Sequence, residues 1–184
     1  AFAVTEPGAG SDTAGISTRA ERKRDSYVLN GRKCFITNGS IADYYLIFAI
    51  TDKISKGMSC FAVPAGSPGL CVGKKENKMG IRASPTTELI LENLRVPAAN
   101  RVGAENEGFS VLMRTLDTSR PTIAAQALGI AEAAFTYALA YARQREQFGQ
   151  PILRFQGLRF MFAEMASKIE AARALLYMTT MLYD

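Results

Sequence analysis

Residues 3–15 read Ala-Val-Thr-Glu-Pro-Gly-Ala-Gly-Ser-Asp-Thr-Ala-Gly, a stretch that mixes glycines with hydroxyl and carboxyl side chains. Its Gly8-Ala9-Gly10 starts like a dinucleotide-binding fingerprint, but Thr13 stands where the third glycine of that motif is required, and a β pattern follows instead of a helix. A P-loop is excluded because no Gly-Lys-Ser/Thr follows. The stretch is therefore either a loop whose backbone N–H groups face an anion, or an ordinary glycine-rich turn.

The sequence that follows, up to about residue 100, has the pattern of short β-strands. Asn30-Gly31 lies between two apolar runs and predicts a type I′ hairpin turn, since both turn positions of that type need positive φ. The apolar run Tyr44–Ile50 predicts a buried strand. Further strands are predicted around Ser59–Val63, Leu70–Lys74, Thr86–Leu91 and Leu94–Val96. Many short strands at this spacing favour a compact sandwich or barrel.

From about Asn106 the apolar residues recur at helical intervals, up to about Arg143. The segment Gln147–Pro151 contains Gly and Pro as break signals, and a second apolar helix is predicted from about Phe155 to Tyr183. The predicted fold class is α+β, with a β-barrel or sandwich domain over residues 1–100 and two long antiparallel helices over residues 101–184. Two helices this apolar need partner helices from further sequence or from other subunits.

Composition limits the chemistry that this chain can carry. The 184 residues contain no His and three Cys without a CxxC pair, which argues against zinc, haem and any other metal site, and excludes Ser-His-Asp catalysis. The net charge of +5 is spread along the chain, and the cluster Arg22-Lys23-Arg24 is interpreted as a solvated turn and not as a nucleic-acid patch. We expect no membrane span, and a reducing compartment fits the unpaired cysteines.

Residues 3–15 match the first signature of the acyl-CoA dehydrogenase family at its fixed positions, which are Ala3, Val4, Thr5, Glu6, Gly10, Ser11, Asp12 and Gly15. Phe35–Gly39 resembles the family's Trp-Ile-Thr-Asn-Gly strand, and Gly73–Arg82 resembles a turn of its β-domain, closest to the short-chain, butyryl-CoA-like branch. Leu116–Pro121 and Arg143–Gly149 resemble two motifs of its C-terminal helices. Several motifs in the family's order make the resemblance specific.

The resemblance implies a fold of three domains, of which this chain would hold the middle β-domain and half of a C-terminal four-helix bundle. Its first residues, Ala1-Phe2-Ala3, include no initiator Met, so we expect an internal piece of a longer protein. The implied reaction is FAD-dependent oxidation of an acyl-CoA to a trans-2-enoyl-CoA. In it a base removes the α proton, and the β hydride passes to flavin N5.

The resemblance also implies which residues hold FAD. One group lies in the β half and consists of Phe2, Val4, Thr5, Gly10, Ser11, Phe35, Ile36 and Thr37. Thr37 would place its hydroxyl on flavin N5, and Phe35 replaces the family's usual Trp. A second group would reach the FAD of a neighbouring subunit and consists of Arg145, Gln147, Phe148 and Gln156. A cofactor shared in this way implies a homo-oligomer, in the family usually a dimer of dimers.

The substrate residues implied by the resemblance are Ser11, Asp117, Thr118, Ser119 and Arg120. For Asp117 and Arg120 the alternative is a surface ion pair between helix positions i and i+3. A minority of the family carries its catalytic Glu at the position of Ser119, but a serine cannot act as that base. The base is therefore expected beyond residue 184, as in most of the family. This piece alone is expected to be inactive.

The partner implied by the resemblance is electron-transfer flavoprotein, in fatty-acid β-oxidation. The expected location is the cytoplasm of a prokaryote or the mitochondrial matrix. Two alternatives stay open. The first is a flavin oxidase related to nitroalkane oxidase, and the second is a catalytically inactive binding fragment.

Overall fold

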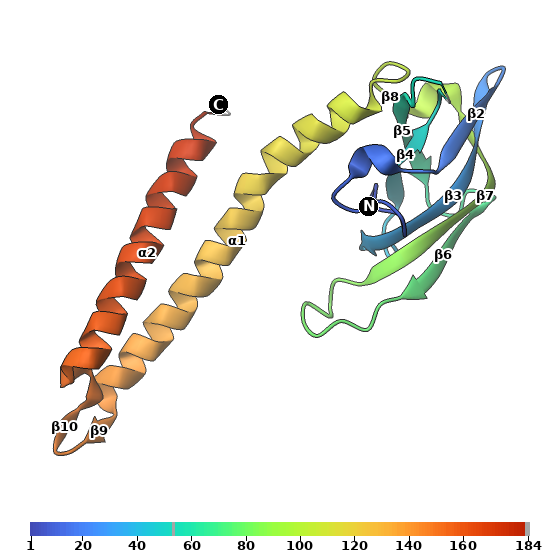
Figure 1. Cartoon of the computed structure of the whole chain (residues 1–184). Helices are drawn as coiled ribbons and strands as arrows, with labels where there is room; N and C mark the ends of the chain where they lie inside the picture. The colour runs from blue at the N-terminus through green and yellow to red at the C-terminus, as the bar shows by residue number, and fades with distance from the viewer. Residues whose placement is uncertain (53, 183–184) are drawn as a thin grey trace. The chain divides into compact units, whose positions relative to one another are not determined.

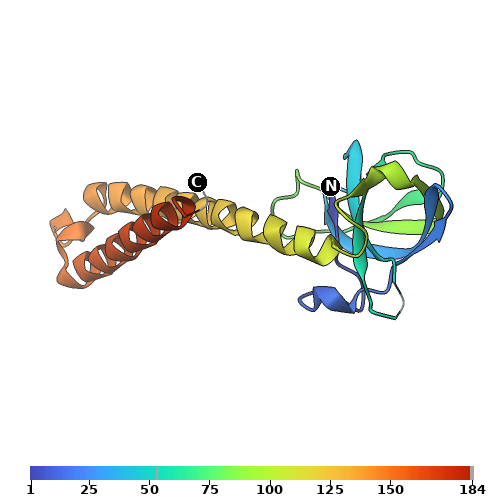
Figure 2. The same ribbon diagram turned by 90° about the horizontal axis from the view of Figure 1, so that it is seen from above.

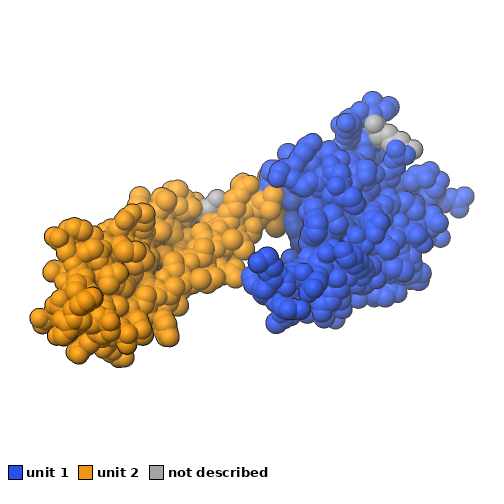
Figure 3. Space-filling model, turned by 60° about the horizontal axis from the view of Figure 1, so that its bottom comes forward, with its two compact units in different colours: residues 1–113 blue, residues 114–184 orange. Residues whose placement is uncertain are grey.

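The computed structural model describes residues 1–52 and 54–182, which fold into two compact units. The first unit spans residues 1–113 and the second spans residues 114–184 (Figure 3). The first is a β-sheet unit and the second is a pair of helices, so the predicted α+β class is confirmed.

The first unit contains a sheet of eight strands in the order β6-β7-β3-β2-β4-β5-β8, with β1 beside β4 (Figure 1). Its strands are β1 (Phe2–Ala3), β2 (Arg19–Lys23), β3 (Ser26–Thr37), β4 (Tyr44–Ile50), β5 (Met58–Pro64), β6 (Leu70–Lys75), β7 (Thr86–Pro97) and β8 (Arg101–Val102). Short 3-10 helices lie at Thr13–Gly15 and Ala98–Asn100. The predicted strand at Tyr44–Ile50 has the bounds of β4, whereas the two strands predicted at Thr86–Leu91 and Leu94–Val96 form one strand, β7.

The sheet curls around one buried apolar cluster (Figure 2). Alternate residues of β4, namely Tyr45, Ile47 and Ala49, point into this cluster, as the period of two in a strand requires. Tyr27 of β3 packs against Phe61 of β5, with ring centroids 4.9 Å apart. Strands that are not neighbours in the sheet therefore share one core, as a barrel or sandwich requires.

The predicted hairpin turn at Asn30-Gly31 is wrong, because both residues lie inside the continuous strand β3. They form an irregularity opposite β7, where the pairing register shifts between Leu29 and Gly31. The side-chain oxygen of Asn30 accepts a hydrogen bond of 2.8 Å from the backbone N–H of Asn93 in β7. A Cβ on Gly31 would lie 2.4 Å from Thr18 Oγ1, so glycine is needed here for close packing and not for a turn.

The real hairpin joins β2 to β3 through Arg24 and Asp25, with Lys23 paired to Ser26 and Arg24 at φ 52°. This is the charged cluster that we interpreted as a solvated turn. It lies at the end of the sheet, and its side chains are exposed.

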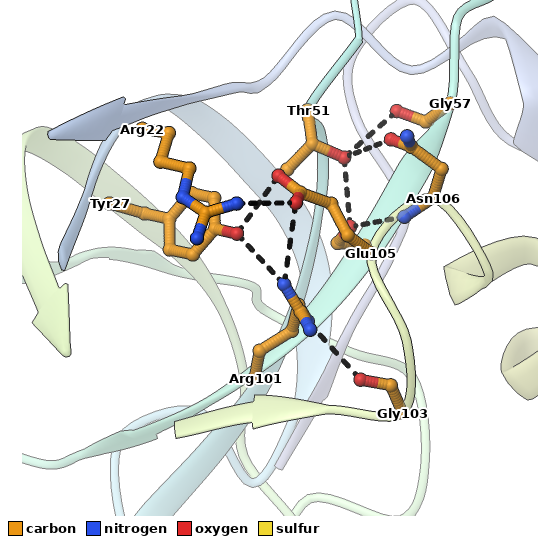
Figure 4. Close-up of polar contacts among 9 residues, drawn as sticks. Arg22, Tyr27, Thr51, Gly57, Arg101, Gly103, Glu105 and Asn106 are labelled. Carbon is orange, nitrogen blue, oxygen red and sulfur yellow. Dashed lines mark hydrogen bonds and ion pairs between the residues drawn. The ribbon is translucent and has the colours of Figure 1, made fainter. Parts of the chain in front are cut away.

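A polar network fixes the segment that follows β8 onto the sheet (Figure 4). Glu105 accepts hydrogen bonds of 2.9 Å from both Arg22 and the hydroxyl of Tyr27. Arg101 donates to the same hydroxyl at 2.9 Å. Beside it, Thr51 donates to the side-chain oxygen of Asn106 at 2.7 Å. These bonds hold residues 101–106 against β2, β3 and the residue that follows β4, just before the first helix begins.

The second unit consists of two long antiparallel helices and the connection between them (Figure 1). Helix α1 spans Gly108–Gln144, with its first turns in the first unit, and helix α2 spans Gln156–Thr180. The connection contains β9 (Glu146–Gln147), β10 (Gln150–Pro151) and a 3-10 helix at Ile152–Arg154. The helices contact each other through Phe135 and Phe162, whose centroids are 5.9 Å apart, and through an ion pair of 3.0 Å between Glu132 and Arg173.

Many apolar side chains of both helices are exposed, as the sequence predicted for helices without their partners. Helix α1 has the length and the apolar content of a segment that could cross a membrane. A single helix of this kind is weak evidence, because core helices of soluble proteins meet the same criterion. The absence of a membrane span therefore stays a prediction.

The close approach of Thr18 to Gly31 makes a testable prediction. In Gly31→Ala the added methyl group would overlap Thr18, so we expect the free energy of unfolding of the β unit to fall by about 1–3 kcal/mol. Gly80→Ala is the matched control, because a Cβ at Gly80 meets no atom within 4 Å. Urea unfolding of both variants measures the difference, and equal stability of the two would contradict the packing described here.

Candidate active site

The glycine-rich segment at the start of the chain is attached to β3 by a buried ion pair. Lys33 Nζ lies 2.8 Å from Glu6 Oε1 and donates a second hydrogen bond of 3.0 Å to the carbonyl of Val4. The side chains of Lys33 and Glu6 are 0% and 3% exposed. Because Lys33 sits within a strand and holds residues on both sides of Thr5, it fixes the backbone of Thr5 against the sheet.

Glu6 also closes the far end of the segment. Its Oε2 accepts hydrogen bonds from the backbone N–H and the hydroxyl of Ser17, at 2.6 and 2.7 Å, and its Oε1 accepts one from the N–H of Thr18 at 3.0 Å. Two backbone hydrogen bonds between Glu6 and Ala9 form a tight turn beside it. One carboxylate thus joins the beginning and the end of the loop that spans residues 6–18.

Burial and hydrogen bonding act in opposite directions on the pKa of Glu6. Burial raises the pKa, but the hydrogen bond and charge of Lys33, together with the donors of Ser17 and Thr18, lower it more, from 4.5 to about 2. The pKa of Lys33 is lowered by burial, which its contacts with Glu6 partly offset. The carboxylate of Glu6 is therefore strongly held in its charged form.

The middle of this loop is open to solvent. Gly8, Gly10 and Ser11 are exposed, and a Cβ on either glycine would meet no atom within 4 Å. A pocket of about 370 Å³ lies beside the loop and is lined by Asp12, Ala14, Gly15, Ser55, Lys56, Met58 and Phe109. The exposure of Ser11 and of the backbone around Gly8 and Gly10 is compatible with both predicted alternatives, an anion-binding loop and an ordinary glycine-rich turn.

One backbone contact joins the predicted flavin residues at the start of the chain to those at the end of β3. The backbone N–H of Cys34 donates to the carbonyl of Thr5 at 2.9 Å, which brings Thr5 next to Phe35. Phe2 packs edge-on against Phe48, with centroids 5.1 Å apart. Val4 and Ile36 are buried, at 6% and 2% exposure, so their side chains belong to the core and only their backbone can face a ligand.

Phe35 has an unusual backbone conformation. Its φ is 56° at a point where the register between β3 and β7 shifts, between Lys33 and Ile36. A bulky residue in this region is strained, and such strain occurs mostly at functional sites. The irregularity turns the ring of Phe35 outward, where it is 63% exposed, and leaves the side chain of Thr37 exposed two residues later.

A second loop, residues 76–85, is attached to this end of β3. Asn38 donates from its backbone to the carbonyl of Pro85 at 2.6 Å, and its side-chain oxygen accepts from the hydroxyl of Ser84 at 2.8 Å. Lys78 Nζ donates to the carbonyls of Ile81 and Ser84, at 2.9 and 2.6 Å. Sequence reasoning recognised this turn by resemblance but did not detect that it supports Phe35–Gly39.

Sequence reasoning also missed the structural role of Lys33. A signal was present, because Lys33 is separated by an even number of residues from the core residues Tyr27 and Leu29 of the same strand. A strand with a period of two places such a lysine on an inner face. A buried lysine requires a carboxylate partner, and the signature offered two acids, Glu6 and Asp12.

The predicted substrate residues of the second unit form one exposed turn of α1. Arg120 donates to Asp117 Oδ1 at 2.6 Å, and the two side chains are 68% and 52% exposed, so the surface ion pair that we considered is present. The hydroxyls of Thr118 and Ser119 donate to helix carbonyls at 3.0–3.1 Å. Pro121 follows and cannot donate to the carbonyl of Asp117. Ser11, the remaining predicted substrate residue, belongs to the first unit.

The second group of predicted flavin residues gathers on the connection between α1 and α2. Arg145, Gln147, Phe148 and Gln156 are all exposed. Phe148 is 92% exposed at φ 52°, beside Gly149 at φ 75°, and its ring meets that of Phe155 edge-on at 6.0 Å. This connection is braced by a backbone hydrogen bond of 2.8 Å from Ile152 to Arg145. The aromatic ring and the guanidinium are thus presented outward on a rigid turn.

No group of three or more potential metal-ligating side chains occurs within residues 1–52 and 54–182. For an organic cofactor the donor set is suitable. It offers an exposed aromatic ring at Phe35, hydroxyls at Thr37 and Ser11, and open backbone at Gly8 and Gly10. A planar ring system joined to phosphate fits residues of these kinds.

Comparisons with known proteins agree on one family. The family model for the acyl-CoA dehydrogenase middle domain matches residues 1–94, and the model for the C-terminal domain of acyl-CoA dehydrogenase matches residues 106–184. A curated relative, the cyclohex-1-ene-1-carbonyl-CoA dehydrogenase of Syntrophus aciditrophicus, is 52% identical over 100% of this chain and 45% of its own length.

Two solved structures are similar to this chain over nearly its full length. The butyryl-CoA dehydrogenase from Megasphaera elsdenii is 50% identical with a TM-score of 0.93, over 96% of this chain and 47% of that one. A structure described as the electron transferring flavoprotein of Acidaminococcus fermentans is 52% identical with a TM-score of 0.95, over 99% of this chain and 48% of that one. The chain spans about half the length of the curated relatives that it matches.

The lowered pKa of Glu6 predicts a dependence of stability on pH. Since the folded pKa of about 2 lies below the ordinary value of 4.5, the stabilisation is present above pH 4.5 and is lost as the pH falls towards 2. Glu6→Gln should be less stable than the unmodified chain by up to about 3 kcal/mol at pH 5, and the two should converge near pH 2.

Glu92→Gln is the control for this comparison, because Glu92 is exposed in β7. Chemical unfolding followed by circular dichroism at each pH gives the free energies. A gap between Glu6→Gln and the unmodified chain that stays constant with pH would show that the carboxylate does not carry this stabilisation.

Proposed function

The chain belongs to the acyl-CoA dehydrogenase family, and from that premise we propose that the protein uses bound FAD to oxidise an acyl-CoA thioester to the trans-2-enoyl-CoA. The observation that carries the proposal is the way in which buried groups hold the loop that spans residues 6–18. A buried carboxylate and a buried ammonium hold Thr5 against β3, where the backbone N–H of Cys34, the residue before the outward-turned Phe35, donates to the Thr5 carbonyl. Because buried charged groups hold its ends, this loop is suited to position a ligand and not only to connect strands.

The residues that would hold FAD fall into the two groups described above. In the β unit, Phe2, Thr5, Phe35 and Thr37 would lie along the ring system, with Val4 and Ile36 contributing backbone only. Gly10 and Ser11 would contact the pyrophosphate. When bound, FAD supplies the acceptor for the hydride of the substrate's β carbon, at N5. Thr37 would orient that atom with its hydroxyl, and Phe35 would exclude water from one side of the ring.

The connection between the helices would complete the cofactor site of a second subunit. Arg145 offers a guanidinium for phosphate oxygens, Phe148 offers a ring for the adenine, and Gln147 and Gln156 offer amides. All four are exposed in this chain, which suits contacts made across an interface. The protein would then be a homo-oligomer, and a dimer of dimers is the form we propose.

The exposed turn Asp117–Arg120 would bind the CoA part of the substrate. The existing ion pair holds the Arg120 guanidinium in place for phosphate or carbonyl oxygens, since each of its N–H groups can donate. The hydroxyls of Thr118 and Ser119 would have to rotate away from the helix carbonyls to reach a ligand. The α proton requires a carboxylate base. Ser119 cannot supply one, so a Glu beyond residue 184 is proposed for this role.

Electron-transfer flavoprotein is the proposed acceptor of the electrons. A solved structure that is 52% identical to this chain is described as an electron transferring flavoprotein, which supports such an association. We place the reaction in fatty-acid β-oxidation, and we propose the prokaryotic cytoplasm or the mitochondrial matrix as its location.

The proposed reaction is tested by adding butyryl-CoA, without oxygen, to the full-length protein reconstituted with FAD. We expect the yellow flavin absorbance to bleach and an enoyl-CoA to form in equal amount. Rapid reoxidation by oxygen alone would instead indicate the flavin oxidase. Retention of FAD without bleaching by butyryl-CoA or cyclohexanecarbonyl-CoA would indicate a binding protein, and failure to retain FAD would refute the proposal.

The CoA role of Arg120 gives a second prediction. In the full-length enzyme, Arg120→Gln should raise KM for the acyl-CoA about tenfold or more and change kcat less, because a charge-assisted bond to a part of the substrate remote from the chemistry is lost. Lys168→Gln is the control, since Lys168 is an exposed helix cation paired with Glu164 at 2.6 Å. Equal KM values in the two variants would contradict a CoA contact.

A further inference from the structure

A pocket at the connection between α1 and α2 is lined by three arginines. It has a volume of about 590 Å³, and its lining residues are Arg143, Gln150, Pro151, Leu153, Arg154 and Arg159. Arg143 lies in the last turn of α1, Arg154 ends the short 3-10 helix, and Arg159 is in the first turns of α2. Three separate elements thus bring guanidinium groups to one concave site.

These three arginines have no ion-pair partner within the described residues 1–52 and 54–182. The connection itself contains one carboxylate, Glu146, and it does not line the pocket. Elsewhere in the same unit the cations Arg120, Lys168 and Arg173 are each paired with a carboxylate. Unpaired like charges that share a pocket repel one another, and a bound anion would remove this repulsion.

The charge arrangement is also unfavourable for the helix that carries it. The N-terminus of a helix has a partial positive charge and favours acidic side chains. Helix α2 has no acidic residue in its first turn and no side-chain cap, and Arg154 and Arg159 flank that end instead. Both features favour an anion near this end of α2, where the two guanidinium groups would supply the donors.

We propose that this pocket is a binding site for a polyphosphate anion, separate from the proposed flavin and CoA contacts. None of Arg145, Gln147, Phe148 and Gln156 lines it. Its volume lies in the range of small-molecule sites and exceeds what one phosphate fills. Guanidinium forks match phosphate oxygens in geometry, and Pro151 and Leu153 form an apolar wall for an organic part of the ligand.

The pocket walls are preformed. The strands β9 and β10 pair through Gln147 and Gln150, and the backbone N–H groups of Ile152 and Arg159 donate to the carbonyls of Arg145 and Phe155 at 2.8 and 3.1 Å. Because the backbone is fixed on both sides of Arg154, an anion would have to order only the arginine side chains.

The test is isothermal titration of the full-length protein with inorganic pyrophosphate and, separately, with ADP, at about 0.15 M salt, where weak surface attraction is screened. We expect saturable pyrophosphate binding that Arg159→Gln weakens about tenfold or more, with Arg159→Lys in between. Arg19→Gln is the matched control, because Arg19 is an exposed cation on β2 with no ion pair among the described residues. Thermal melting of each variant checks that it is folded.

The outcomes separate the possible sources of binding. Tighter binding of ADP than of pyrophosphate supports a nucleotide ligand, and equal binding supports an inorganic one. If Arg145→Gln abolishes binding and Arg159→Gln does not, the anion occupies the proposed flavin site and the pocket is refuted. The proposal also fails if pyrophosphate does not bind, or if Arg19→Gln weakens binding as much as Arg159→Gln.

Discussion

The buried ion pair between Lys33 and Glu6 is the contact on which the candidate active site depends. Removing two charges from water is costly, and the cost is offset only when their remaining hydrogen-bonding capacity is used. Here Glu6 accepts from Lys33, Ser17 and Thr18, and Lys33 also donates to Val4. An apolar pair could fill the same space, but it could not define where the backbone of Thr5 lies. The pair therefore supplies position more than stability.

Three residues of the β unit with positive φ lie in the segments of the candidate flavin site. Phe35, Asn38 and Ile81 all have positive φ and lie in two segments joined by hydrogen bonds of 2.6 and 2.8 Å. The opposite end of the unit, at Glu105 and Tyr27, is held by ordinary ion pairs and hydrogen bonds. The segments that would meet a ligand are thus irregular. Positive φ also occurs where the unit meets the first helix, at Asn106, so backbone strain alone does not distinguish the site.

The sequence predicted the elements with a strong apolar pattern and failed where tertiary contacts decide. The run Tyr44–Ile50 predicted the bounds of strand β4, although its Tyr44 and Leu46 side chains are exposed and not buried. The apolar spacing predicted both helices within a few residues, except that the predicted end of the second, Tyr183, lies outside the described residues. Asn30-Gly31 was assigned to a turn because Asn-Gly is a strong local signal for one. In the structure the glycine is needed instead because Thr18 packs closely against it. The partnership of Lys33 with Glu6 was not predicted either, because it joins residues 27 positions apart. The domain limits at residue 100 and the roles of the site residues stay predictions.

The double attachment of Glu6 has a consequence for how tightly a ligand can be held. Ordering one backbone residue costs about 1–2 kcal/mol in conformational entropy. If the loop were free, much of the free energy of ligand binding would be spent on ordering it. The carboxylate joins residue 6 to residues 17 and 18, as a covalent cross-link would, without needing an oxidising environment. The disorder is removed when the chain folds. A ligand that arrives afterwards meets a loop that has already taken its shape.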